Sequence, residues 1–111
     1  MKSSAFFILL LLGACCPMPK TVRLDPLQGI NITPVNVPPH SRTVSVWRNN
    51  YDTVAVRLWF TEASGEIAYV YDLVSGSNMF PVPIAAGVST IGVQKMSGAD
   101  TEARVIFNPG M

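Results

Sequence analysis

After residue 42, apolar residues recur at every second position through most of the chain. This is the period of a β-strand that buries one face, whereas no stretch keeps a sustained helical period. A further short strand is predicted within residues 79–84, where Pro81 and Pro83 limit its length. The predicted inward residues of the five longer segments are Val44 and Val46; Val54, Val56, Leu58 and Phe60; Ile67, Tyr69, Tyr71 and Leu73; Ile91 and Val93; and Ala103, Val105 and Phe107.

Turn-forming residues separate these segments, as in 49–52, 63–65 and 75–78. Short strands spaced by such turns predict an all-β fold, a small antiparallel β-sandwich or barrel. The strands that contain Val44 and Val54 allow two arrangements. They form a hairpin with a three-residue loop, which puts Val46 opposite Val54, or they lie in different sheets.

The segment 16–39 is rich in proline and poor in aromatic residues. Such composition favours an extended, semi-rigid spacer, so we expect a tether that passes into the first strand. That strand is expected at Thr21–Leu24 or at Ile30–Val35. The sandwich domain is accordingly assigned to residues 40–111.

The N-terminus combines one basic residue, Lys2, with an unbroken apolar run at 5–12. A membrane-spanning helix needs about 20 apolar residues, so this run is too short. A basic start, a short apolar centre and small residues after it are typical of an export signal.

The end of this leader, Leu12-Gly13-Ala14-Cys15, resembles the lipobox of bacterial lipoproteins. The resemblance implies cleavage between Ala14 and Cys15 and a covalent lipid on Cys15, with 1–14 as signal peptide and 15–39 as lipidated tether. Position two of the mature chain is Cys16 rather than Asp, which implies outer-membrane sorting in a Gram-negative host. An ordinary secretory signal is the alternative.

Composition narrows the classes of function. The chain is 49% hydrophobic and 14% charged with a formal net charge of +1, so it lacks the basic footprint of a nucleic-acid-binding protein. One histidine and two adjacent cysteines are too few for a structural zinc site. The histidine, His40, lies in a predicted loop, and no catalytic motif is present. We therefore expect no enzymatic activity, no metal and no cofactor apart from the lipid.

A second resemblance lies in the domain. The segments 44–59 and 80–93 resemble bacterial immunoglobulin-like sandwiches, such as the first domain of pilus chaperones. There, a strand ends in an Asn-rich turn before a strand that bears Trp, and an apolar-Pro stretch follows later. The resemblance implies an immunoglobulin-like sandwich and carries no chaperone function.

The candidate binding residues are Trp47, Arg57 and Trp59, which alternate with the inward valines and so face outward. Exposed tryptophan and arginine are enriched in interfaces. Two interpretations stay open: these residues bind a partner protein of the cell envelope or, as the alternative ligand, a glycan such as peptidoglycan, or their outer face packs under the proline-rich tether or another sheet edge. The sequence thus predicts a non-enzymatic, membrane-anchored lipoprotein that serves a secretion, conjugation, pilus or phage-related assembly.

Overall fold

The chain forms eight consecutive β-strands in this computed structural model, which describes residues 18–76 and 80–109. Their bounds are β1 Lys20–Leu27, β2 Ile32–Asn36, β3 Ser41–Arg48, β4 Ala55–Glu62, β5 Ile67–Leu73, β6 Val82–Pro83, β7 Val88–Ser97 and β8 Thr101–Pro109.

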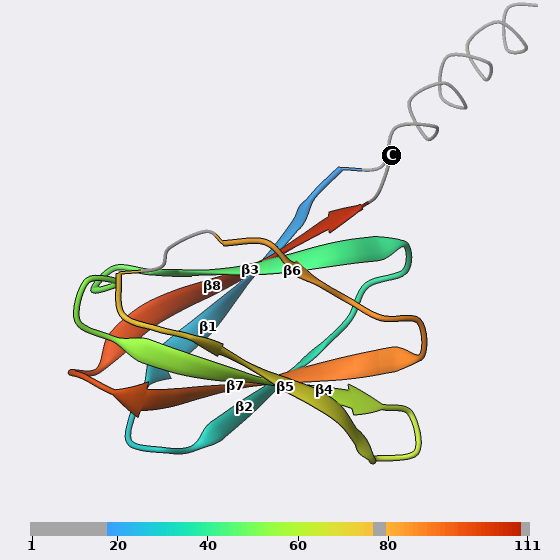
Figure 1. Ribbon diagram of the computed structural model, residues 1–111. Helices are drawn as coiled ribbons and strands as arrows, with labels where there is room; N and C mark the ends of the chain where they lie inside the picture. Colours follow the sequence, from blue (N-terminus) through green and yellow to red (C-terminus); the bar gives the residue numbers. More distant parts are fainter. Residues whose placement is uncertain (1–17, 77–79, 110–111) are drawn as a thin grey trace, which may run out of the picture.

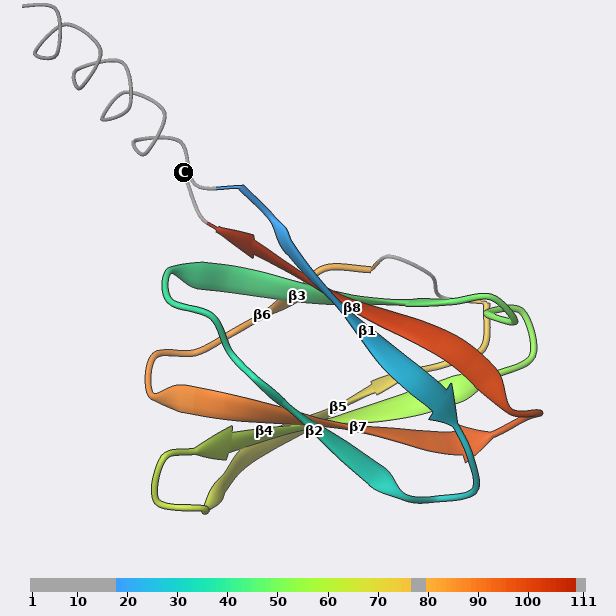
Figure 2. The same ribbon diagram turned by 180° about the vertical axis from the view of Figure 1, so that it is seen from behind.

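The strands build two four-stranded sheets, ordered β1-β8-β3-β6 and β2-β7-β4-β5, in which every pair is antiparallel. Figure 1 shows the first sheet above the second, and Figure 2 shows the same two layers from behind. The predicted all-β antiparallel sandwich is confirmed.

The connectivity is that of a jelly roll. Among the eight strands of the described residues, only β4 and β5 are consecutive strands of the same sheet, and every other pair of consecutive strands lies in different sheets. In an immunoglobulin sandwich the last two strands lie in the same sheet, whereas here β7 and β8 lie in different sheets. The expected sandwich is therefore present, but its strand order is not immunoglobulin-like.

The facing sides of the two sheets enclose the core. Alternation puts every second residue of a strand on this inner side, so the predicted inward rows become buried. The fully buried side chains include Val44 and Val46 from β3, Val56, Leu58 and Phe60 from β4, Ile91 and Val93 from β7, and Val105 and Phe107 from β8.

The strands that contain Val44 and Val54 follow the second of the two predicted arrangements. The first is β3 of the upper sheet, and the second leads into β4 of the lower sheet. One inward prediction is wrong: Ile67 is 56% exposed. The register of β4 and β5 shifts between Phe60 and Thr61, and this bulge breaks the alternation just before Tyr69.

The predicted boundary between tether and domain also needs correction. Both candidate first strands exist, as β1 and β2, and they pair with β8 and β7. The sandwich therefore begins at Lys20 rather than at residue 40. Pro26 and Pro34 are tolerated because β1 and β2 are edge strands, where a residue that lacks an N–H can face away from the one neighbouring strand.

Candidate functional site

The three predicted binding residues do not form one patch. Trp47 lies on β3 and points away from the core on the outer side of one sheet, whereas Arg57 and Trp59 lie on β4 in the other sheet. Because each residue alternates with buried neighbours of its own strand, the two outer faces point in opposite directions. The structure thus keeps Arg57 and Trp59 together and separates Trp47 from them.

Arg57 forms a two-point ion pair with Asp72, which lies directly opposite on β5. Its Nε donates to Oδ1 at 2.7 Å and its Nη2 donates to Oδ2 at 3.2 Å. These hydrogen bonds lower the pKa of the Asp72 carboxyl and raise the pKa of the Arg57 guanidinium from their ordinary values. The pair joins β4 to the edge strand on the outer face.

Replacing Asp72 with Asn is expected to lower the melting temperature slightly at neutral pH and not at all in strong acid. A carboxyl whose pKa is depressed in the folded state stabilises that state above its ordinary pKa of about 3.9, and this contribution disappears as pH falls through the folded-state pKa. The effect is small and sensitive to salt because the two side chains are 33% and 52% exposed.

Melting curves between neutral pH and strong acid measure this difference. Arg57→Gln is the matched control, since it removes the other partner and should show the same pH dependence. A melting-temperature difference of equal size at every pH would contradict the role of the pair.

Trp59 lies beside the ion pair, and a hydrogen bond from its indole N–H holds the ring in place. Its Nε1 donates to Gln94 Oε1 at 2.9 Å, and Gln94 Nε2 donates to the Ile30 carbonyl at 2.9 Å. Directly opposite Trp59 on β7 is Gly92, where a Cβ would lie 2.6 Å from Ile32 Cγ2. The missing side chain lets Ile32 and Trp59 approach each other over the sheet.

The result is a shallow apolar trough on the outer face of β2, β7, β4 and β5. Its lining includes Ile32, Pro34, Trp59, Ile67 and Gly92. Sequence reasoning found Trp59 but missed the others. Gln94 and Ile32 join Trp59 only through strand pairing between segments far apart in the chain, so no local pattern indicates them.

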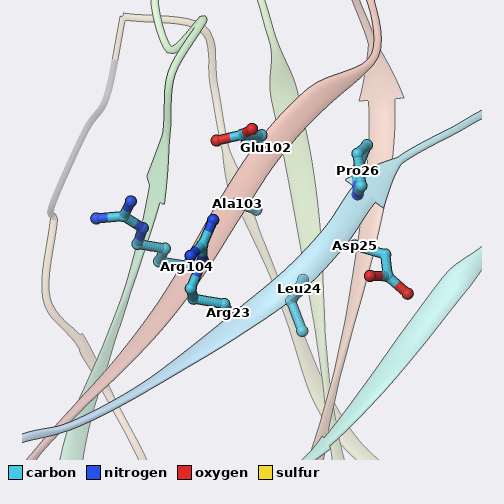
Figure 3. Close-up of a pocket in the computed structure, with 7 residues that line it drawn as sticks. All are labelled: Arg23, Leu24, Asp25, Pro26, Glu102, Ala103 and Arg104. Atoms are coloured by element: carbon cyan, nitrogen blue, oxygen red, sulfur yellow. The ribbon is translucent and has the colours of Figure 1, made fainter.

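On the opposite outer face, Trp47 packs with Arg104. The Arg104 guanidinium carbon lies 4.9 Å from the Trp47 ring centroid, and these two residues are cross-strand partners. Arg104 is also directly opposite Arg23 of β1. Figure 3 shows Arg23 and Arg104 side by side in a hollow that Asp25 and Glu102 also line. The charges of these four side chains balance, so the hollow does not favour a strongly anionic ligand.

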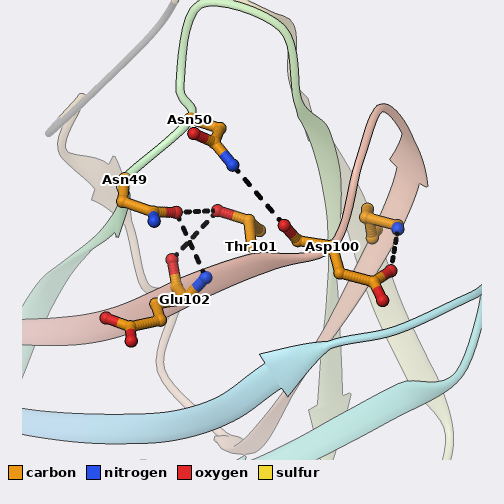
Figure 4. A network of polar contacts seen from close by, with 6 residues as sticks. Asn49, Asn50, Asp100, Thr101 and Glu102 are labelled. Atoms are coloured by element: carbon orange, nitrogen blue, oxygen red, sulfur yellow. Dashed lines mark hydrogen bonds and ion pairs between the residues drawn. The ribbon is translucent and has the colours of Figure 1, made fainter.

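A polar network braces the end of the sandwich where β3 ends and β8 begins (Figure 4). Asn49 Oδ1 accepts from Thr101 Oγ1 at 2.6 Å and from the Glu102 backbone N–H at 3.2 Å. Lys95 Nζ forms an ion pair with Asp100 Oδ1 at 2.8 Å. These bonds satisfy polar groups at the strand ends and position the turns rather than a reactive group.

The C-terminal end of β3 carries a buried arginine, which no sequence motif indicates. Arg48 follows Val44 and Val46 on the inner face and is 0% exposed. Burial lowers the pKa of its guanidinium.

His40 lies in the turn between β2 and β3 and is exposed. Its φ of 67° is in the left-handed region, which histidine enters more readily than most residues. Glu62 and Glu66 flank the β4–β5 turn, where the Glu62 N–H donates to the Glu66 carbonyl at 2.8 Å. Both acidic side chains are exposed at this hairpin end.

The predicted cleavage and lipidation residues, Ala14 and Cys15, lie outside the described residues. Within 18–76 and 80–109, no three His, Cys, Asp or Glu side chains gather closely enough to hold a metal ion. The same residues contain no helix long and apolar enough to cross a membrane.

The fold and these outer faces define a two-sheet, antiparallel β-sandwich protein. In its fold the chain is similar to the crystal structure of the SPBc2 prophage-derived protein YomS, with a TM-score of 0.51 and 13% sequence identity. The match covers 83% of this chain and 96% of that one. No family model and no curated protein matches the sequence. At this identity the similarity concerns the fold alone.

Proposed function

We propose that the protein is a non-enzymatic lipoprotein of the cell envelope, in which a lipid on Cys15 anchors a β-sandwich that binds another envelope component. The observation that supports the proposal is that the lipobox-like motif Leu12-Gly13-Ala14-Cys15 is followed closely by a β-sandwich, whose first strand begins at Lys20. Such a head would serve a secretion, conjugation, pilus or phage-related assembly as a binding or structural part.

The short spacing between the proposed lipid anchor and the sandwich indicates that the sandwich would lie close to the membrane. Residues 16–19 alone separate Cys15 from β1. Even fully extended, this segment spans roughly 18 Å between the Cα atoms of Cys15 and Lys20. A lipid on Cys15 would therefore hold the start of β1 close to the bilayer, in the outer membrane of a Gram-negative host.

This attachment would direct one end of the sandwich toward the lipid. At that end Lys20 pairs with Phe107. These two residues line a hollow together with Met18, Pro38 and His40. The outer faces of the two sheets run away from this end and would stay accessible to a partner (Figure 2). The apolar trough around Trp59 supports a protein partner on one of them.

The geometry favours a protein over a glycan. Sugar rings need a free aromatic face, but a guanidinium already lies over each ring. The Arg104 carbon is 4.9 Å from the Trp47 centroid, and the Arg57 carbon is 5.7 Å from the Trp59 centroid. A sugar that stacks on the face under the guanidinium would have to displace this cation–π contact, whereas an apolar protein segment can bind in the trough beside it.

Replacing Cys15 with Ser is expected to abolish incorporation of radiolabelled palmitate and to release the protein from the membrane fraction. The reason is that acyl chains contribute about 0.8 kcal/mol per buried CH₂, and more than one chain gives a stable anchor. Metabolic labelling followed by membrane fractionation measures both effects.

Cys16→Ser is the matched control, because it removes the neighbouring thiol and leaves the lipobox intact. It should keep the label at the level of the parent chain. A Cys15→Ser chain that is still labelled, or a parent chain without label, would refute the proposed anchor.

A further inference from the structure

The end of the sandwich where β1 begins is basic on the upper sheet and acidic on the lower sheet. β1 and β3 both start at this end and carry Lys20 and Arg42 in their first two residues. The lower sheet contributes the turn between β4 and β5, which Glu62 and Glu66 flank. Figures 1 and 2 show the starts of β1 and β3 and the β4–β5 turn at the same end of the molecule, over different layers.

The two basic side chains at this end are exposed and lie outside the ion pairs of the fold. Within the part of the chain that the structure describes, ion pairs engage Arg57 and Lys95 but neither Lys20 nor Arg42. Lys20 lines one hollow and Arg42 lines the next, and the two hollows share the turn of residues 38–41. The described residues that line these hollows include no Asp and no Glu, so the positive charge is not compensated there.

We propose that Lys20, Arg42 and the turn 38–41, together the basic corner, bind the headgroups of anionic phospholipids. This inference rests on the proposed lipid anchor and adds a second, electrostatic contact with the same bilayer. The contact holds the upper sheet against the headgroups and keeps the acidic β4–β5 turn away from them. The trough around Trp59, on the outer face of the lower sheet, then points away from the membrane and toward a partner.

The short connection to the anchor supports the bilayer as the occupant of the basic corner. A lipid on Cys15 would keep Lys20 within about 18 Å of the membrane surface, since residues 16–19 alone separate the two. Met18 lies on this path and is 76% exposed, so it offers an apolar side chain to the boundary between headgroups and acyl chains. Near an anionic surface, each Lys or Arg raises binding roughly fivefold.

Fluorescence quenching of the lipidated protein tests the basic corner. The fluorophore is placed on Pro39→Cys, in a chain that also carries Cys16→Ser so that the introduced thiol alone is labelled. The protein is reconstituted into phosphatidylcholine vesicles, with or without phosphatidylglycerol, that contain a lipid with a quencher on its headgroup. Phosphatidylglycerol should increase the quenching at position 39. High salt should reverse the increase, because the Debye length falls from about 10 Å at 0.1 M to about 3 Å at 1 M.

Ala63→Cys provides the matched position for the label. Both residues are exposed and follow the first residue of a turn closed by a backbone hydrogen bond, from the Ser41 N–H to the Pro38 carbonyl at 3.4 Å and from the Gly65 N–H to the Glu62 carbonyl at 2.9 Å. A tether without the basic corner would bring both turns to the bilayer equally. We expect weaker quenching at position 63 than at position 39, with no increase in phosphatidylglycerol.

Substitutions of the basic residues provide the second measurement. Lys20→Gln and Arg42→Gln should each lower the ratio of docked to undocked protein in phosphatidylglycerol vesicles roughly fivefold. Arg23→Gln is the matched control, because it removes the same charge from the same strand as Lys20. Arg23 lines the other hollow, where Asp25 and Glu102 balance the charge, so this variant should keep the parent ratio. Melting curves establish that all three variants are folded.

Three results would overturn the basic corner. These are equal quenching at positions 39 and 63, quenching at position 39 that does not depend on phosphatidylglycerol, and an equal effect of Lys20→Gln and Arg23→Gln. The intact mass of the same preparation reports the lipid on Cys15 separately. An anchored protein that fails these tests refutes the basic corner and keeps the anchor, whereas a chain without lipid refutes both.

Discussion

Replacing Phe60 with Ala is expected to lower the free energy of unfolding by about 3–5 kcal/mol, one of the two largest effects we expect from a single substitution. Phe60 is 0% exposed on the inner face of β4, and its ring stacks on Tyr69 with centroids 4.3 Å apart. The variant would lose the free energy gained by burying the ring and would leave a cavity where the ring packs. Each kcal/mol of lost stability lowers the melting temperature of a domain of this size by about 4–8 °C, so a decrease of at least about 12 °C is expected. This loss is a large part of the total stability of such a domain, which is about 5–15 kcal/mol.

Tyr69→Phe is the control for this prediction. It keeps the ring that stacks on Phe60 and removes the hydroxyl that bridges Pro83 and Ala85. We expect it to cost about 1 kcal/mol, the usual net contribution of a hydrogen bond. Thermal and denaturant unfolding measure both variants, and a Phe60→Ala protein as stable as Tyr69→Phe would contradict the packing role of the Phe60 ring in the core.

Replacing Gly98 with Ala is expected to cost about 2–6 kcal/mol, for two separable reasons. Gly98 has a φ of +96°, which a side chain makes unfavourable by about 1–3 kcal/mol. An added Cβ would also lie 2.6 Å from the Thr53 carbonyl oxygen and 3.0 Å from the Val54 Cα, so backbone has to move. Overpacking of this kind adds about 1–3 kcal/mol.

Gly87→Ala isolates the first of these costs. Gly87 has a φ of +94°, and an added Cβ would meet nothing within 4 Å. Its loss of stability in urea unfolding should therefore be clearly smaller than that of Gly98→Ala. If the two variants lose the same stability, the close approach of the β7–β8 turn to Thr53 does not contribute.

The strands of the core were predictable because alternation is a local property. Val44, Val46, Val56, Leu58 and Phe60 are inward in the sequence pattern and buried in the structure. The exception, Ile67, follows from a bulge that involves the register of two strands, which no single segment encodes. The proline-rich start was interpreted as a tether because composition does not distinguish a spacer from an edge strand.

The candidate site was predictable only in part. Arg57 and Trp59 were found because they alternate with buried residues of one strand. Their partners Asp72 and Gln94 lie 15 and 35 positions away and are supplied by pairing. Trp47 was grouped with them because it has the same outward pattern, and only the assignment of β3 and β4 to different sheets separates the two surfaces.

The amino-acid sequence established that this chain is built from strands, which residues of the strands after residue 40 face the core, apart from Ile67, and where the turns between them fall. These are consequences of side-chain alternation and turn chemistry over a few neighbouring residues. The tertiary structure decided which strands pair, and with that the jelly-roll order and the trough around Gly92. Pairing depends on contacts between distant segments, and the same alternating pattern is compatible with more than one strand order.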